Sequence, residues 1–390
     1  MKTNIIINRG TCRIEVRTSV RDSFTEFHLT ATVEDTGAAG PTAEQLFTSL
    51  AAELLARRIQ PIQEKLYGLS RVRDEVLKWR DRIYRLRGLD RTMPVTWIEG
   101  GPLQTGEFAG VQIWGVASGD GESCVRTVEN VVTGRGREWT GEGFRMLHLP
   151  AVNGMRPGGS LADGRAAQAE QMFANVGDAL AAHGMKYPNV VRTWIYVAHL
   201  LEWYGDMNRV RTAHYRSKGL GVEGGPAFPA STGIMGRSDS EECLMDVLAM
   251  ENLLPGRVVA TPINRSAKQH SSFNYGSSFS RAMSLEIEGR RTIHVSGTAS
   301  INSAGLSTHL GDAEHQCLET LLSISAILAE QGGGLKNITS ATLFCKDRAA
   351  WEVWERTTRL LQLPDIPKVC VLADVCRDNL LVEMEVVAVI

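Results

Sequence analysis

The chain repeats one order of strand-like and helix-like segments three times, and each repeat has the size of a domain. In the last repeat, a strand pattern over 291–300 precedes a helical pattern that opens near Gln316, and a second strand and a second helix follow. A proline stands before the closing strands of the repeats, at Pro94, Pro229 and Pro367. These prolines lie 135 and 138 residues apart (229 − 94 and 367 − 229). This period is too long for a solenoid and predicts three like modules in one chain.

The middle repeat keeps the same order of segments, whereas the first repeat shows this order less completely. Middle strands are predicted over 144–149 and 191–198, with helices that open near Gln171 and run through Met207. The first repeat shows clearly only one early strand, one helix and two late strands. Short strands that are bounded by turn residues and alternate with helices predict an α+β fold, with helices on one face of each sheet.

These patterns divide the chain into three modules, at 1–118, 119–255 and 256–390. We expect the modules to pack as a pseudo-trimer, because an isolated module would leave an apolar sheet face exposed. Functional sites would then lie where modules meet, and the first module is expected to be degenerate. The glycine-rich and charged stretch 117–143 and the aperiodic stretch 252–270 are predicted to connect modules.

The composition excludes several classes of partner. Lysine and arginine total 42 against 44 acidic residues, and no long basic block occurs, so neither nucleic acid nor an anionic membrane is expected to bind. No apolar run has the length of a membrane span. Seven cysteines, an odd number without a Cys-x-x-Cys pair, are typical of reduced thiols in a cytoplasmic protein. The sequence therefore predicts a cytoplasmic protein.

Four segments of the third module resemble the RidA/YjgF superfamily, namely Val295–Ser300, Gly311–Gln316, Phe344–Asp347 and Val382–Ala388. The resemblance covers the last two modules well and the first in outline. It implies small barrels of the chorismate-mutase type that form trimers, with a site in each cleft between subunits. Most members of the family hydrolyse reactive imines and enamines, and relatives are described as endoribonucleases or translation initiation inhibitors.

A narrower resemblance is to the chorismatase group of tandem RidA-like proteins. It rests on Tyr275–Ala282, Val295–Ile301 and Ala373–Glu383, and on Arg192–Tyr196 and Pro229–Gly233 in the middle module. Members of this group split chorismate into pyruvate and a dihydroxycyclohexadiene or hydroxybenzoate. The resemblance implies a cofactor-free hydrolase that acts on a small carboxylated metabolite, in the cleft that the third module shares with a neighbour.

Hydrolysis of an enol ether such as that of chorismate begins when an acid protonates the terminal methylene. The acid must hold its proton near neutral pH, which burial or a neighbouring carboxylate can achieve. Glu383 and Glu385 lie two residues apart on a strand pattern, point to the same side and have apolar neighbours. The resemblance places Glu383 at the catalytic-acid position, with Glu385 in the substrate site. The alternative is that both are solvent-facing charges on an outer strand.

The two carboxylates of such a substrate require cations, and Arg281 and Lys368 lie in the matching motifs. The deaminases of the family carry an arginine shortly after the proline of the module. In this chain the third module has Lys368 there, the middle module Ser231 and the first module Thr96. Lysine keeps the charge but loses the planar, two-pronged donor face of arginine.

Further substrate-binding residues are predicted in the same half of the chain. Lys346 and Arg356 are candidate cations, although Lys346 beside Asp347 also fits an ion pair and Arg356 a helix surface charge. Tyr275 could orient a hydroxyl group, or it is a half-buried core phenol. Cys376 has no histidine or asparagine motif to activate it, so we interpret it as pocket wall. The resemblance adds the segment Gly297, Thr298 and Ala299 to the substrate site.

No cofactor is implied, and no metal-binding pattern occurs. Two alternatives to a chorismatase-like enzyme remain: an imine or enamine deaminase of the broader family, and a non-catalytic ligand-binding regulator that kept the fold. Because the motif residues concentrate in the third module, we expect one working site per chain. A pseudo-trimer closed within one chain also predicts a monomer or a weak homo-oligomer.

Overall fold

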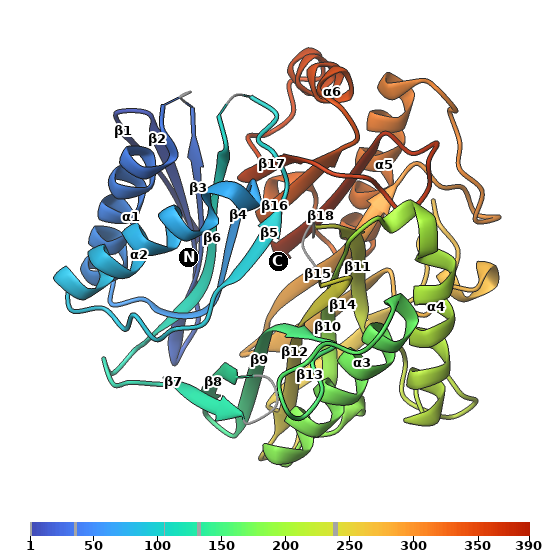
Figure 1. Ribbon diagram of the computed structural model, residues 1–390, viewed down its shortest axis with the longest axis horizontal. Helices are drawn as coiled ribbons and strands as arrows, with labels where there is room; N and C mark the ends of the chain where they lie inside the picture. Colours follow the sequence, from blue (N-terminus) through green and yellow to red (C-terminus); the bar gives the residue numbers. More distant parts are fainter. Residues whose placement is uncertain (1, 35–36, 105, 131–133, 237–240) are drawn as a thin grey trace.

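Three six-stranded sheets, each covered by two helices, make up the protein (Figure 1). The computed structural model describes residues 2–34, 37–104, 106–130, 134–236 and 241–390. Each module runs through three antiparallel strands, a helix, a strand, a second helix, an edge strand and a closing strand. The edge strand pairs in parallel with the fourth strand, and the closing strand returns to the middle of the sheet. The fold is α+β with three modules in one chain, as the sequence predicts.

The three sheets have the same strand order. The first has the order β1-β2-β3-β6-β4-β5 and comprises β1 (Lys2–Arg9), β2 (Cys12–Val20), β3 (Phe24–Val33), α1 (Ala39–Ala56), β4 (Gln60–Gly68), α2 (Arg73–Leu86), β5 (Thr96–Glu99) and β6 (Phe108–Ser118). The second comprises β7 (Val125–Asn130), β8 (Gly134–Gly141), β9 (Phe144–Asn153), α3 (Arg165–Ala182), β10 (Val190–Val197), α4 (Leu200–Ser217), β11 (Ala230–Met235) and β12 (Cys243–Asn252). The third comprises β13 (Val258–Ile263), β14 (Ala282–Ile287), β15 (Arg290–Ala299), α5 (Ala313–Glu330), β16 (Ile338–Cys345), α6 (Arg348–Leu360), β17 (Lys368–Leu372) and β18 (Val382–Val389).

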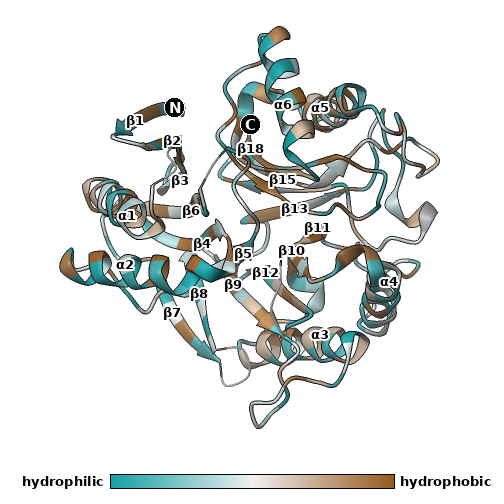
Figure 2. Cartoon of the chain, turned by 45° about the horizontal axis from the view of Figure 1, so that its top comes forward, coloured by the Kyte–Doolittle hydropathy of each residue, from teal (hydrophilic) through white to brown (hydrophobic). Residues whose placement is uncertain are grey.

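Each module has an apolar core between its sheet and its own helices, and a further core fills the centre of the molecule. Phe47 of α1, Phe173 of α3 and Ile324 of α5 are fully buried against their sheets. The central core joins the inner faces of all three sheets and includes Trp114 of the first module and Trp139 of the second. Figure 2 shows the sheets around this centre with the helices on the outside.

The edge strands connect the modules in a cyclic order. Strand β5 packs on β9 of the second module, β11 on β15 of the third, and β17 on β6 of the first. Isolated bridges join Ala230 to Ser280 and Pro102 to Val371 across two of these contacts. Each cleft between modules is therefore built from the edge strand of one module and the inner sheet face of the next, and the ring closes within one chain.

The predicted connectors are wrong in part, because strands occupy both stretches. Strands β7 and β8 lie within 117–143, and β13 lies within 252–270. These strands stand at the outer side of their sheets, and each exposes part of its length. A partly exposed strand needs few apolar residues, so its sequence pattern resembles that of a loop. The predicted module boundaries at 118/119 and 255/256 fall between the sheets.

No helix in the described part of the chain is long and apolar enough to cross a membrane. All seven cysteines are free thiols. Cys345 and Cys370 are buried in the core of the third module.

Candidate active site

A cavity of about 170 Å³ lies between the second and third modules. Helix α4 and strand β11 supply its lining from the second module. The third module supplies the segment before β14, the end of β15, the loop after β17 and the start of β18. The contact between β11 and β15 brings these elements together.

Glu383 lines this cavity from strand β18. Met384 packs into the core beneath the helices, so Glu383 and Glu385 face the other side of the sheet, towards the neighbouring modules. Ala299 of β15 and Phe344 of β16 stand opposite Glu383 on the two adjacent strands. Both glutamates are buried. The alternative of two solvent-facing charges is therefore wrong, because β18 is a central strand.

Glu383 holds its proton at neutral pH. Burial raises the pKa of Glu383 to about 8, and the neighbouring charge of Glu385 adds to this rise, whereas Arg192 opposes it. A carboxyl group in this state can donate a proton to a substrate near pH 7.

Gly297 leaves the space that the Glu383 side chain occupies. A Cβ atom on Gly297 would collide with Oε1 of Glu383. The pairing of β15 with β18 shifts between Val295 and Thr298, which marks a bulge at this point of the strand. The backbone N–H of Gly297 donates to Oγ1 of Thr232 on β11 (3.0 Å), which ties the bulge to the second module.

Two buried arginines flank one aromatic ring in the cavity wall. The guanidinium carbons of Arg211 and Arg281 lie 5.8 and 5.4 Å from the ring centre of Phe279. Arg281 donates from Nε and Nη2 to the carbonyl of His270 (3.1 and 3.0 Å). Arg211 donates from Nη2 to Asn208, whereas its buried Nε has no hydrogen-bond partner among the described residues.

Arg377 and Cys376 complete the polar wall. Nη1 of Arg377 donates to Oγ of Ser307 (3.2 Å). Burial raises the pKa of the Cys376 thiol to about 12, and the carboxyl of Glu383 adds to this rise. The thiol therefore stays protonated and serves as pocket wall, not as a nucleophile. Three guanidinium groups thus converge on a cavity whose carboxyl group is neutral, a setting suited to an anionic ligand.

The structure brings together five of the predicted site residues: Arg281, Gly297, Ala299, Cys376 and Glu383 all line the cavity. Thr298 is buried beside them and donates its hydroxyl to the carbonyl of Ser296 (2.8 Å). Glu385 lies further along β18, in a separate cavity of about 40 Å³ at the centre of the molecule.

The other predicted residues do not reach the cavity, or their side chains are not described. Lys346 forms an ion pair with Asp378 (2.6 Å), and exposed Arg356 lies 3.7 Å from Glu314. Tyr275 lies in the short helix Ser272–Tyr275, and its side chain lies outside the described part of the structure.

Lys368 lies on β17, and its Nζ is 3.4 Å from Glu355 of α6. Because β17 packs on the first module, Lys368 belongs to a different cleft from Glu383. The residue from this position that lines the Glu383 cavity is Ser231 of β11. Lys368 therefore lies outside the cavity that Glu383 lines.

Sequence reasoning missed Arg211 and Arg192, although both carry a signal. Arg211 stands between Met207 and Tyr215 at spacings of four, so it lies on the buried face of α4. Arg192 interrupts a strand whose other residues are apolar or small, and the whole strand is buried. A charged residue in such a place is costly unless it has a partner, and this indicates a function. Among the described residues, no group of three or more side chains could hold a metal ion.

The comparisons with known proteins agree with this fold. Residues 276–390 match the family described as Endoribonuclease L-PSP. A crystal structure of a chorismatase is 19% identical, covers 84% of this chain and 92% of its own, and superposes with a TM-score of 0.59. No curated protein matches the chain.

Single-module structures also match. A putative endoribonuclease L-PSP from Entamoeba histolytica is 16% identical and covers 34% of this chain and 100% of its own, with a TM-score of 0.29. A YjgF family member from Neisseria meningitidis is 19% identical and covers 34% of this chain and 94% of its own, with a TM-score of 0.26. Residues 276–390 thus match the Endoribonuclease L-PSP family, and the fold of the chain is similar to that of a chorismatase.

Proposed function

We propose that the cavity between the second and third modules hydrolyses the enol ether of a small dicarboxylate, chorismate or a close relative, and releases pyruvate without a cofactor. The observation that carries this proposal is a carboxyl group with a pKa of about 8, Glu383, inside a cavity lined by Arg211, Arg281 and Arg377. Such a site binds anions and delivers a proton at neutral pH, which are the two requirements of this reaction.

In the proposed reaction, Glu383 donates its proton to the terminal methylene of the enol ether. The resulting oxocarbenium ion adds water at the ether carbon, and the proton released from this water returns to the Glu383 carboxylate. The hemiketal then collapses to pyruvate and the ring alcohol, so one water is consumed and Glu383 is regenerated. A positioned general acid contributes about 10²–10⁴-fold to such a step.

The arginines support the same step by holding the substrate. A planar guanidinium group binds a carboxylate through two parallel hydrogen bonds, which fixes both position and orientation. The guanidinium groups of Arg211 and Arg281 both lie within about 6 Å of the ring centre of Phe279, which helps to hold them in the cavity wall. We assign the two carboxylates of the substrate to this pair and to Arg377.

The imine or enamine deaminase interpretation has less support in this cavity. It relied on a cation at the position of Lys368, and the corresponding residue that lines the cavity is Ser231. The carboxylate clamp of the deaminases is therefore missing at its family position, and the arginines of the cavity stand elsewhere.

The test is to incubate the purified protein with chorismate and to measure pyruvate. Pyruvate release that depends on Glu383 supports the proposal. Ammonia release from an enamine substrate, without pyruvate from chorismate, would instead favour a deaminase. A rise in melting temperature with chorismate but no turnover would favour a ligand-binding regulator.

We further infer a cytoplasmic, monomeric protein. All seven cysteines are free, which fits a reducing compartment. The ring of modules is closed by contacts of β5, β11 and β17 within one chain, so no further subunit is needed to cover the central core. Analytical ultracentrifugation should therefore give a mass near 42.7 kDa, and a stable homotrimer would contradict this inference.

A further inference from the structure

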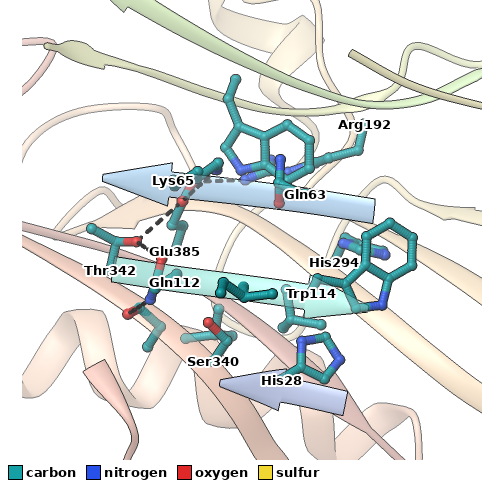
Figure 3. A pocket seen from close by; sticks show the side chains of 15 residues that line it. His28, Gln63, Lys65, Gln112, Trp114, Arg192, His294, Ser340, Thr342 and Glu385 are labelled. Atoms are coloured by element: carbon teal, nitrogen blue, oxygen red, sulfur yellow. Dashed lines mark hydrogen bonds and ion pairs between the residues drawn. The ribbon is translucent and has the colours of Figure 1, made fainter. Parts of the chain in front are cut away.

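A charged cluster lies at the centre of the molecule, where the three sheets meet (Figure 3). We call Lys65, Arg192, Thr232, Thr342 and Glu385 the axial cluster. Every member is buried. Lys65 comes from β4 of the first module, Arg192 and Thr232 from the second module, and Thr342 and Glu385 from the third. All three modules therefore contribute to one buried group.

Glu385 is the hub of the axial cluster. Its Oε2 accepts hydrogen bonds from Nη2 of Arg192 (2.8 Å) and from Oγ1 of Thr232. Its Oε1 lies 3.4 Å from Oγ1 of Thr342, which donates to it, and 3.8 Å from Nζ of Lys65. A buried carboxylate is tolerated when cations and hydrogen bonds satisfy both oxygens, as they do here. This arrangement pairs the carboxylate of Glu385 with two cations.

The two cations of the axial cluster are held in place by one indole. Nζ of Lys65 lies 3.9 Å from the ring centre of Trp194, and the guanidinium carbon of Arg192 lies 4.8 Å from it. Cation–π contacts of this kind gain strength when the charges are removed from water. Lys65 and Arg192 thus remain beside Glu385 although both are buried.

A hydrogen-bonded link joins the axial cluster to the candidate active site. Oγ1 of Thr232 donates to Glu385 and accepts from the backbone of Gly297 (3.0 Å). Gly297 is the residue whose missing side chain makes room for Glu383. Glu383 and Glu385 also share one face of β18, two residues apart. The hub and the proposed acid are therefore adjacent and fixed relative to each other.

We infer that Glu385 is a positioning residue: its carboxylate is paired with Lys65 and Arg192, so Glu385 is the charged member of the pair and the neighbouring Glu383 is the member that carries the proton in its proposed role as the acid. This inference rests on the proposed function of the Glu383 cavity. It gives the first module a role in catalysis, because its Lys65 stabilises the hub although the cavity is lined by the other two modules.

Other charged and titratable groups face the two carboxyls and influence how this pair titrates. Those around Glu383 come from four segments besides β18: Arg192, Arg211, Arg281, Cys376 and Arg377. Those around Glu385, besides the axial cluster, are two buried phenols and two buried imidazoles: Tyr67, Tyr196, His28 and His294. Burial raises the pKa values of Tyr67 and Tyr196, so both phenols stay neutral.

The experiment is a titration of the free protein, followed by carbon-13 NMR of glutamate side-chain carboxyls. The Glu383 signal is the one that disappears in Glu383→Gln. In Glu385→Gln the Glu383 midpoint should fall by about 1 to 3 pH units, because the neighbouring negative charge is gone. In Lys65→Met it should rise, because removing a cation makes the second proton of the pair harder to lose.

The matched control is Asp246→Asn. Asp246 is fully buried, interacts with Lys65 and accepts a hydrogen bond from Thr96, as Glu385 does from Thr232. This variant should move the Glu383 midpoint much less than Glu385→Gln does. An unchanged midpoint in Glu385→Gln, or a fall in Lys65→Met, would overturn the inference. If Glu385→Gln does not fold, the sign of the Lys65→Met shift decides.

The titration uses no substrate, so its result is independent of the proposed reaction. If the midpoints shift as expected but chorismate gives no pyruvate, the positioning role holds and the assigned substrate is wrong. If pyruvate forms and depends on Glu383 while the midpoints do not shift, the reaction holds and the positioning role is wrong.

Discussion

The clefts on either side of the second module are built alike but carry different charges. In each cleft an arginine from the second helix of a module stands four residues before a buried tyrosine: Arg211 before Tyr215 in α4, and Arg80 before Tyr84 in α2. Arg211 lines the cavity with Glu383, and Arg80 lines a wider cavity of about 690 Å³ between the first and second modules. The two arginines therefore hold corresponding places.

Their partners differ. Nε of Arg80 donates to Oε2 of Glu64 (2.9 Å), and the Tyr84 hydroxyl donates to Oε1 of the same carboxylate (2.8 Å). Arg211 donates to the neutral amide of Asn208. One arginine is thus neutralised by a buried carboxylate, whereas the hydrogen-bond partner of the other is a neutral amide, which fits our proposal that its charge serves a ligand.

The closing strands of the second and third modules, β12 and β18, also differ in charge. Asp246 of β12 accepts from Thr96, as Glu385 of β18 accepts from Thr232, so these two acids correspond. Two residues earlier, β12 has the buried apolar side chain of Leu244 where β18 has Glu383. Few substitutions therefore separate a structural cleft from a candidate active site. This contrast supports our proposal of one working site per chain.

The largest effect is expected for Glu383→Gln. Glutamine keeps the shape of the side chain but has no acid proton, so pyruvate release from chorismate should fall about 10²–10⁴-fold while binding changes little. Steady-state kinetics would show this as a loss in kcat. Arg91→Met, in the wall of the cleft between the first and second modules, should leave the rate unchanged. A loss below about tenfold in Glu383→Gln would be too small for a general acid.

Glu64→Gln should lower the free energy of unfolding more than Thr193→Val, the change at the corresponding position of the second module. It removes the buried counter-charge of Arg80 and leaves only the half-exposed Asp81, at a cost of about 3–5 kcal/mol. Thr193→Val, which removes only a hydroxyl hydrogen bond to Ser231, should cost about 1 kcal/mol. Urea unfolding measures both values. Equal losses would mean that the two arginines do not differ as described.

Arg211→Met and Arg80→Met should separate binding from stability. Losing a charged hydrogen bond to a substrate carboxylate should raise KM for chorismate about 10- to 100-fold in Arg211→Met, with a smaller effect on kcat. Arg80→Met should leave KM unchanged and lower the melting temperature instead. A rise of KM in both variants would place the substrate in both clefts and contradict a single working site.

The smallest effect concerns the centre, where His28, His148 and His294 occupy corresponding strands of the three modules. Burial lowers the pKa of His294 to about 3, and neither ring nitrogen has a partner among the described residues. The native state thus keeps His294 neutral, whereas the unfolded state binds a proton below about pH 6.5. Stability should therefore fall as the pH falls from 6.5 towards 3.

For His294 alone this loss amounts to about 2 kcal/mol at pH 5 relative to neutral pH. His294→Leu should flatten this part of the pH dependence of unfolding, as measured by urea titrations between pH 5 and pH 7. A slope identical to that of the wild type would mean that His294 is already protonated in the native protein.

Much of the fold could be predicted because local patterns encode it. In the third module the sequence pattern predicts a helix near Gln316 followed by a strand, and the structure has α5 and β16 at these places. The outer strands β7, β8 and β13 were missed because a partly exposed strand carries few apolar residues. The spacing of Glu383 and Glu385 predicted two carboxyls on one face of a strand, since alternation fixes which side chains share a face.

The sequence by itself determined three modules, their internal order, and five of the third-module residues that line the cavity. Only the tertiary structure decided which module faces which. Lys368 lies on β17, which packs on the first module, whereas Arg211 of the second module lines the cavity with Glu383. The reason is that each edge strand packs on the next module in the ring. Contacts between modules join residues that lie far apart in the sequence, such as Thr232 with Gly297 and Lys65 with Glu385, and no local periodicity records such pairings. The charges that set the acidity of Glu383 are likewise fixed by packing, since Lys65 and Arg192 reach Glu385 only after all three sheets have met.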